Sequence, residues 1–292
     1  MERYKRRFGD RYDGRRIRNI DPFFRLIPHL MKTRADAQTF FDEKIYIDDI
    51  DSYIRSKKEL CMNNISFLHI VIASLVRTMS QKPALNRFVA GRKIYARNDI
   101  FVSLAVKKHL IENSPETTIK FKFEPTDTLD DVVNKVNALI EENKKDLTSN
   151  DTDKTANIIS LCPNFLIKFV VWLFETMDYF GFMTKLLNQV SPFHTSLFIT
   201  DLGSLGIQPV YHHIYNFGTT SLFMAFGAKQ REKVIDKDNN IVERKYINLK
   251  IVTDERITDG YYYATAFKLF KYLMMHPEKL ELPPEKIIED IE

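Results

Sequence analysis

A strand pattern, a polar turn and a helix pattern follow one another near the end of the chain, between residues 245 and 275. The first part, KYINLKIVTDE, places apolar residues at every second position, which is typical of a half-buried β-strand. The helical part has one apolar face, made of Ala266, Phe267, Phe270, Leu273 and Met274. A helix that follows a strand so closely favours a layered fold, in which the helix packs on a sheet.

The same two periodicities recur along the chain, beginning with a short helix expected in residues 34–43. Helix patterns cover residues 66–80, which Pro83 ends, and residues 129–143, where Thr128 stands three positions before Asp131 as in a capping box. Strand patterns flank Arg97-Asn98-Asp99 and predict a hairpin, and further strands are expected in KIYIDDI, TIKFKFEP, TSLFITDLGSLG and SLFMAFGAKQREKV, with a turn at residues 238–240. This mixture predicts an α+β fold, a two-layer α/β sandwich with helices packed on a mixed sheet.

Composition limits the class of protein. A chain of 292 residues, of which 44% are hydrophobic and 28% charged, fits one large globular domain or one domain with appended arms. The net charge of +4 is too small for this length to indicate a nucleic-acid partner. Residues 1–20 are basic and residues 276–292 acidic, so we expect solvated or docking arms, or a polyanion contact made by the first arm.

Cysteine usage and the N-terminus bear on the compartment. Cys61 and Cys162 have no second cysteine or histidine at metal-ligand spacing, so the sequence predicts neither a disulfide framework nor a zinc site. The N-terminus is charged and lacks the apolar region of a secretory signal. These features predict a protein of the reducing cytoplasm.

The most apolar segment, residues 158–187, is interrupted by Pro163, Lys168, Glu175 and Asp178. Its unbroken runs are shorter than the roughly 18 residues needed to span a bilayer. Stable membrane insertion is therefore not expected. We expect a helix that is buried in the core or at a subunit contact, with a helix lying on a membrane surface as the alternative.

Four segments within residues 64–282 carry a resemblance to a known family. ISFLHIVIASLVRTMSQKPALNRFV looks like a family helix ending in proline and asparagine, and DIFVSLAVKK looks like the strand after it. FITDLGSLGI is similar to a Phe-Thr-Ile-Ser-Asn-Leu-Gly turn, and LKIVTDERITDGYYYATAFKLF to a strand, a His-x-x-x-Asp-Gly loop and a helix. In this order they resemble the catalytic domain of dihydrolipoyl acyltransferases, the core subunits of 2-oxoacid dehydrogenase complexes, and chloramphenicol acetyltransferase. The resemblance divides the chain into a basic arm and extension (1–60), an acyltransferase-like domain (61–282) and an acidic tail (283–292).

The resemblance implies a mechanism and a set of site residues. In that family the loop histidine takes a proton from a thiol or hydroxyl acceptor, which then attacks an acyl thioester. A serine or threonine of the neighbouring subunit stabilises the oxyanion, in a tunnel between the subunits of a trimer that coenzyme A enters from one end. Here Thr200 matches the oxyanion hydroxyl, Asp259 the structural aspartate and Gly260 the glycine, while Glu255 stands in the place of the histidine. The implied donor is an acyl-coenzyme A, with no metal.

A glutamate in the place of the histidine changes the chemistry. An exposed glutamate is a weaker base toward a thiol than histidine by about 2 pKa units, or about 3 kcal/mol of proton-transfer free energy, although burial in a dry tunnel closes this gap. His212 and His213, expected on a strand and so facing opposite ways, and His194 are alternative bases or merely structural histidines. Thr200 also suits a strand by propensity alone, and Asp259 also suits a helix N-cap.

Two functions follow as expectations. The first is a stand-alone trimeric acyltransferase acting on a small acceptor, because no lipoyl or peripheral-subunit-binding domain precedes the catalytic region. The second is a catalytically inactive homologue that serves as a trimeric scaffold or ligand-binding protein, because the histidine is replaced.

Overall fold

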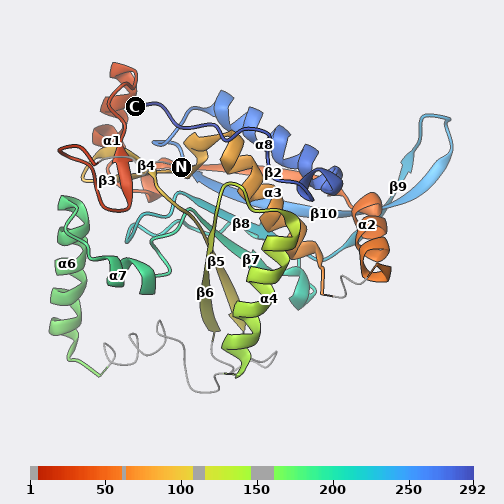
Figure 1. The fold of residues 1–292 in the computed structure, drawn as a ribbon, viewed down its shortest axis with the longest axis horizontal. Helices are drawn as coiled ribbons and strands as arrows, with labels where there is room; N and C mark the ends of the chain where they lie inside the picture. Colours follow the sequence, from red (N-terminus) through yellow and green to blue (C-terminus); the bar gives the residue numbers. More distant parts are fainter. Residues whose placement is uncertain (1–5, 61–63, 108–115, 146–160) are drawn as a thin grey trace.

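The computed structural model describes residues 6–60, 64–107, 116–145 and 161–292. One sheet of seven strands forms its centre (Figure 1). The strand order is β2 (Gln38–Tyr46), β10 (Ile241–Asp254), β8 (Leu222–Phe226), β7 (Leu197–Asp201), β5 (Ile100–Lys107) and β6 (Glu116–Phe123), with β9 (Gln230–Ile235) paired to the first half of β10. The pairs β5–β7 and β7–β8 are parallel and the others antiparallel, so the sheet is mixed as expected.

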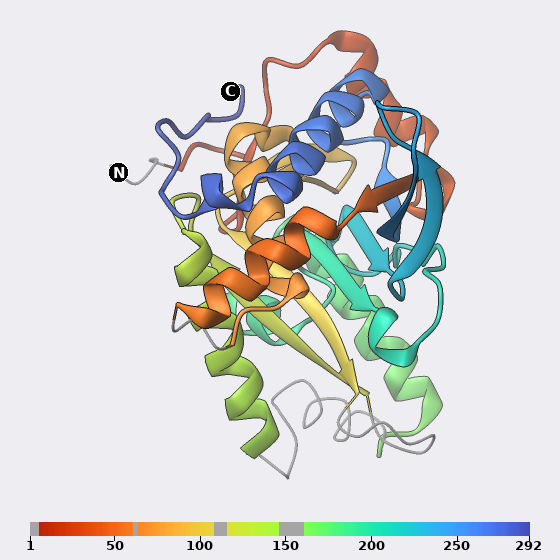
Figure 2. The same cartoon turned by 90° about the vertical axis from the view of Figure 1, so that its right-hand side faces the viewer.

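Four helices cover one face of this sheet (Figure 2): α2 (Asp48–Glu59), α3 (Phe67–Gln81), α4 (Leu129–Lys145) and α8 (Gly260–Met275). Their apolar side chains and the sheet residues facing them form one large buried core. The second layer consists of these helices, so the two-layer α+β architecture is confirmed. Thr128 and Asp131 exchange the hydrogen bonds of the expected capping box at the start of α4.

A small sheet stands beside the large one, with strands in the order β1 (Gly14–Arg16), β4 (Lys93–Arg97) and β3 (Arg87–Ala90), which follows the 3-10 helix η2 (Pro83–Asn86). The hairpin expected around Arg97-Asn98-Asp99 is wrong: β4 ends there, and β5 begins in the other sheet. The real hairpin joins β3 to β4 through Gly91 and Arg92, both with positive φ. A strand pattern predicts extended backbone but not the partner strand.

Both ends of the chain pack on the body. The first arm supplies β1, and the acidic tail runs back so that Asp290 receives two hydrogen bonds from the Arg87 guanidinium, at 2.6 and 2.7 Å. Arg7 and Glu292 form an exposed ion pair, which joins the arm to the tail. Both arms are therefore docked on the protein, which was one of the expectations for them.

Two irregular regions differ from expectation. Residues 34–43, expected to be a short helix, contain only the single 3-10 turn η1 (Ala35–Ala37) before β2 begins. Residues 207–217, which include the expected strand at His212 and His213, form no strand and lie as irregular chain against the open face of the large sheet. The remaining short elements are α1 (Pro22–Leu30), α7 (Lys185–Val190), η3 (Gly203–Leu205) and η4 (Pro277–Leu280).

The apolar segment forms helix α6 (Asn164–Phe180), and it is not in the core. None of its residues is buried, and it stands at the edge of the molecule, attached to the β3–β4 region near its C-terminal end (Figure 1). The expectation of a core helix is therefore wrong. Within the described residues, no helix is long and apolar enough to cross a membrane.

Candidate active site at the turn after strand β10

The turn between β10 and α8 is built on a buried ion pair. Asp254, the last residue of β10, is fully buried, and its two carboxylate oxygens accept hydrogen bonds from Nε and Nη2 of Arg256 at 2.8 and 2.7 Å. The Tyr263 hydroxyl, also buried, donates to the Asp254 carbonyl oxygen at 2.8 Å. A bidentate pair of this kind fixes direction as well as distance, so the turn is held in a single conformation.

Glu255 lies on the outside of this fixed turn. Its side chain is exposed, while its backbone N–H donates to the Ala37 carbonyl oxygen at 2.8 Å. Asp259 caps α8 by accepting from the Tyr262 N–H at 2.9 Å, which is the N-cap role that the sequence also allowed. The Glu255 side chain is therefore exposed on a turn whose backbone conformation is fixed.

A second buried arginine extends this support. Arg34 lies 4.0 Å from Asp254 and donates to the carbonyl oxygens of Asn216 and Val89, each at 2.8 Å. Burial lowers the pKa of Arg34 to about 10, with Asp254 opposing the shift, so the guanidinium stays charged at neutral pH. It connects the turn to the small sheet and to the irregular segment 207–217.

Thr200 lies on β7, on the face of the sheet that does not pack against the helices. Strand pairing places Thr200 level with Ala225 of β8 and Lys250 of β10, five residues before Glu255. At about 3.3 Å per residue, this is a separation of roughly 17 Å along the strand, besides the distance across two strands. One chain therefore brings Glu255 and Asp259 together but keeps Thr200 away from both.

The two neighbouring histidines behave differently. The His212 ring stacks on Phe223 with centroids 4.6 Å apart, and burial lowers the pKa of His212. His213 is exposed and contacts the ring of Tyr215. They face different ways as expected, although no strand is present there. His212 lies over the same face of the sheet as Thr200, because Phe223 pairs with Phe198, two residues before Thr200.

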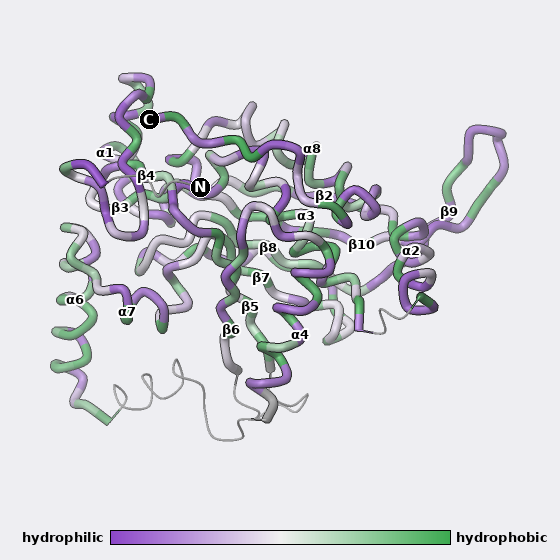
Figure 3. Tube along the Cα trace, viewed as in Figure 1, coloured by the Kyte–Doolittle hydropathy of each residue, from purple (hydrophilic) through white to green (hydrophobic). Residues whose placement is uncertain are grey.

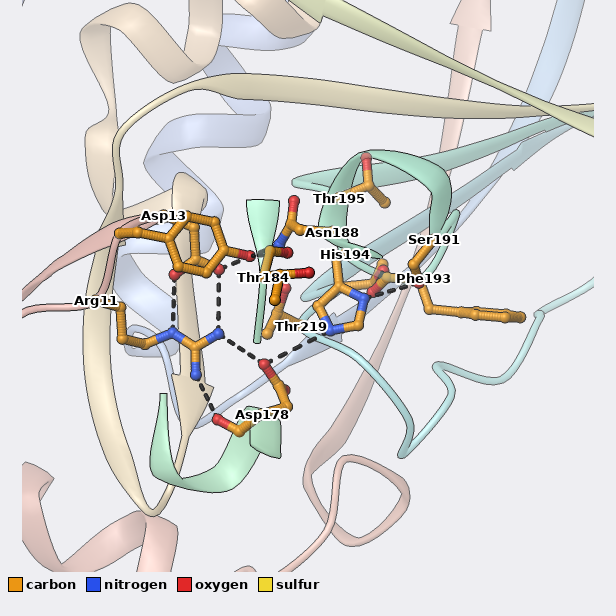
Figure 4. A network of polar contacts seen from close by, with 12 residues as sticks. Arg11, Asp13, Asp178, Thr184, Asn188, Ser191, Phe193, His194, Thr195 and Thr219 are labelled. Atoms are coloured by element: carbon orange, nitrogen blue, oxygen red, sulfur yellow. Dashed lines mark hydrogen bonds and ion pairs between the residues drawn. The ribbon is translucent and has the colours of Figure 1, made fainter. Parts of the chain in front are cut away.

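His194 is fully buried in a polar network that holds the N-terminal arm (Figure 4). Its Nδ1 lies 2.8 Å from the Ser191 Oγ, and its Nε2 lies 3.6 Å from an oxygen of Asp178, which also accepts from Arg11 at 2.6 Å. Burial lowers the pKa of His194 despite Asp178. For Asp178 burial acts to raise the pKa, but the nearby His194 ring and the charge of Arg11 overcome it, so its pKa lies well below the usual range.

Charged residues that sequence reasoning missed surround this network. Arg11 makes a buried bidentate pair with Asp13, and the buried Arg97 donates to Thr219 and Thr195 carbonyl oxygens at 2.8 and 3.2 Å. Burial lowers the pKa of Arg97 to about 10. No local sequence pattern predicts that these arginines are buried, because Arg11 also pairs with Asp178, and Arg97 bonds to Thr195 and Thr219, all far along the chain.

Lys120 of β6 is the other residue that was missed. Its Nζ donates to the carbonyl oxygens of Asn188 and Ser191, at 2.7 and 3.2 Å. Burial, followed by the nearby charge of Arg97, lowers the pKa of Lys120 to about 7. The alternating pattern of TIKFKFEP could place Lys120 on one face of a strand, but not beneath the loop that covers it.

Comparisons with known proteins identify a matching family over part of the chain. Residues 190–282 match the family described as 2-oxoacid dehydrogenases acyltransferase (catalytic domain), and this range holds Thr200, Glu255 and Asp259. No curated protein matches the sequence.

Solved structures share the fold over nearly the whole chain. A probable dihydrolipoamide acetyltransferase from Listeria monocytogenes 4b F2365 superposes with a TM-score of 0.56 at 14% identity, covering 92% of this chain and 96% of that one. Dihydrolipoamide acetyltransferase from Azotobacter vinelandii gives 0.59 at 12% identity, covering 91% and 94%. That structure concerns the roles of a serine, a histidine and an asparagine in the catalytic mechanism of that enzyme.

A third structure, the truncated catalytic core of the 2-oxoacid dehydrogenase complex from Thermoplasma acidophilum, gives a TM-score of 0.54 at 13% identity, covering 90% of this chain and 99% of that one. The protein therefore has the fold of dihydrolipoamide acetyltransferase cores, and its residues 190–282 match the family of 2-oxoacid dehydrogenase acyltransferase catalytic domains.

Proposed function

We propose that the protein is a stand-alone acyltransferase that moves an acyl group from coenzyme A, or a related thioester, to a small acceptor. The observation that carries this proposal is the turn after β10, where a buried ion pair presents Glu255 outward, within the range that matches the acyltransferase family. A rigid support of this kind is what a catalytic base requires.

The chemistry needs two groups from this chain. The Glu255 carboxylate accepts the proton of the acceptor's hydroxyl, thiol or amine as that group attacks the thioester carbonyl carbon. The Thr200 hydroxyl donates a hydrogen bond to the oxyanion of the tetrahedral intermediate. The carbon–sulfur bond then breaks, and the coenzyme A sulfur takes up the proton from Glu255.

The separation of Thr200 and Glu255 supports a site shared between chains. The register keeps them roughly 17 Å apart along the sheet within one copy, so a single reacting group cannot contact both. A neighbouring chain would bring its own Thr200 to the first chain's Glu255 and would cover that exposed carboxylate. We therefore propose a homotrimer, the assembly that the family resemblance implies.

The first test is turnover. Acetyl-coenzyme A is incubated with a panel of small alcohols, thiols and amines, and release of the coenzyme A thiol is followed. Glu255→Gln is expected to slow transfer by about 10²- to 10⁴-fold, and Thr200→Ala by about 10²- to 10³-fold. Glu243→Gln, on the exposed first half of β10, is the matched control and leaves the rate unchanged. Unchanged turnover in both site variants would refute these roles.

The exposure of Glu255 favours a second candidate, an inactive homologue that acts as a trimeric scaffold or ligand-binding protein. The two candidates differ in a calorimetric titration with coenzyme A followed by the turnover assay. Binding without transfer, together with transfer gained by Glu255→His, would support the second candidate. Robust transfer by the unaltered protein would exclude it.

A further inference from the structure

Helix α6 is largely apolar (Figure 3), and none of its residues is buried by the described part of the chain. Phe165 is 75% exposed, Trp172 57% and Phe169 53%, and all three lie on the side of the helix turned away from the body. Leu166, Leu173 and Phe180 continue this face. Soluble monomers rarely expose so many large side chains in one contiguous patch, so this face is expected to contact a partner.

Helix α1 presents a second apolar face at the same end of the molecule. Phe23, Leu26 and Leu30 are each more than half exposed. Figures 1 and 2 place α1 and α6 at one end, with the small sheet between them. His29 of α1, the β3–β4 turn and Tyr179 to Gly181 of α6 line a common hollow, which shows that the two helices border one surface.

The hollows between these helices are strongly basic. One, of about 550 Å³, lies between α1 and β4, and the other, of about 400 Å³, lies between α1 and the end of α6. Their basic lining residues are Arg11, Arg16, Arg18, Arg25, Arg92 and Lys93, together with His29. Among the described lining residues Asp10 is the only acid, and Arg18 binds it at 2.8 Å. Arg11 is paired with Asp13 and Asp178, so among the described lining residues the charges that can attract an anion from outside are those of Arg16, Arg25, Arg92 and Lys93.

The surface of an anionic phospholipid bilayer has apolar acyl chains below charged phosphate headgroups. Exposed aromatic side chains suit the first, and a basic hollow beside them suits the second. Tryptophan, phenylalanine and leucine enter the boundary between headgroups and acyl chains, and arginine and lysine bind the phosphates. A second copy docking through the same face would bring two basic hollows together, because an isologous contact pairs a patch with itself. The charge thus favours an anionic membrane over a self-paired dimer formed through this face.

We propose that this end of the protein docks on the surface of an anionic phospholipid bilayer. The exposed faces of α1 and α6 enter the interface, and the basic hollows hold lipid phosphate groups. The proposal needs no acyl transfer, so it stands or falls separately from the proposed function.

Trp172 gives a direct readout, because it is the only tryptophan of the chain. The full chain is titrated with phosphatidylcholine vesicles and with vesicles that also contain phosphatidylserine. The emission of Trp172 is expected to shift to shorter wavelength, and the protein to sediment with the vesicles, only when phosphatidylserine is present. Added salt is expected to weaken this binding because it screens the charges.

Two pairs of substitutions separate the two parts of the surface. Phe165→Ser with Phe169→Ser removes apolar contact with the bilayer, and Arg25→Glu with Lys93→Glu reverses two charges. Each pair of substitutions is expected to weaken binding to the anionic vesicles by about tenfold or more. The matched controls are Ile241→Ser, equally exposed on β10, and Lys237→Glu with Lys268→Glu, both exposed elsewhere. Thermal unfolding confirms that each variant is folded.

Three results would overturn the proposal. Equal binding to neutral and anionic vesicles would remove the role of the basic hollows. A blue shift that depends on protein concentration without vesicles, and that Phe165→Ser with Phe169→Ser abolishes, would show that a second copy covers the face. A spectral change caused by inorganic phosphate or coenzyme A, with none caused by vesicles, would assign the hollows to a soluble phosphate ligand.

Discussion

At the scale of single residues, the candidate site depends on charges that are buried in pairs. Asp254 and Arg256 are both almost completely excluded from water, and each satisfies the other. Removal of one member leaves the other charged and desolvated, which costs far more than the pair itself contributes. The rigidity of the turn at Glu255 should therefore be sensitive to this pair.

Arg256→Met tests this dependence. The substitution keeps an unbranched but shorter side chain and removes both hydrogen bonds that the Arg256 guanidinium donates to Asp254, leaving Arg34 at 4.0 Å as its charged partner, so the free energy of unfolding is expected to fall by about 3–5 kcal/mol. Urea denaturation followed by circular dichroism measures the change. Arg231→Met, which breaks the exposed pair with Glu243, is the control and should change it by less than about 1 kcal/mol. Equal effects of the two would contradict the role given to the buried pair.

The sequence predicted part of this site. Glu255 and Asp259 both lie in the short connection between β10 and α8, and Asp259 has the N-cap role that the sequence allowed, while the catalytic roles of both stay predictions. Arg34 and Lys120 could not be predicted, because each becomes buried only when segments distant along the chain cover it. Local sequence patterns do not show which distant segment will bury a given side chain.

At the scale of elements, the start of α3 depends on a histidine. The Ser66 N–H donates to Nδ1 of His69 at 2.9 Å, and the Ser66 hydroxyl lies 2.8 Å from the same nitrogen. This Nδ1 accepts only while it carries no proton. Burial lowers the pKa of His69 from 6.5 to about 4, with Asn137 opposing the shift.

A lowered histidine pKa makes stability depend on pH. Because the unfolded chain binds the proton more readily, the contribution of His69 is fully present above pH 6.5 and is lost as pH falls toward 4, by up to about 3 kcal/mol. His69→Gln keeps a polar side chain at the capping-box position but cannot titrate. The difference between the urea stabilities of the unaltered protein and this variant should therefore shrink between pH 6.5 and 4. For the exposed His213→Gln, the difference should stay constant.

The positions of helices were predicted better than their burial and than the pairing of strands. Periodicity gave α3, α4 and α8 almost to their ends, because each has one apolar face and a clear start or stop signal. Helix α6 is apolar on most sides, a pattern that usually means a buried helix, and the sequence does not reveal that its residues stay unburied among the described part of the chain. The pairing of β4 was missed for a related reason, since partner choice is decided by the whole sheet.

At the scale of the whole molecule, the question is how many chains make one site. The sheet is continuous from β7 to β10, so no rearrangement within one chain can bring Thr200 to Glu255 without breaking strand pairs. Buried arginines hold the small sheet in place, because Arg97 of β4 donates to the Thr195 carbonyl oxygen just before β7 and Arg87 of β3 donates to the Ile257 carbonyl oxygen of the turn. The single chain is therefore a rigid part of the site. If the site is active, the Thr200 that acts with a given Glu255 must come from another copy.

Mixing two inactive variants tests this arrangement. Thr200→Ala keeps Glu255, and Glu255→Gln keeps Thr200, so a mixed trimer contains some interfaces at which both native residues meet. Random assembly from equal amounts should restore about one quarter of the sites. Turnover of acetyl-coenzyme A is measured after the two variants are unfolded and refolded together. The controls are each variant refolded alone and the double variant mixed with Glu255→Gln, none of which can form an intact site. The shared site would be refuted if the mixture is no more active than either variant refolded alone, or if the protein sediments as a monomer at the assay concentration. Ligand binding would then be the remaining role of the fold.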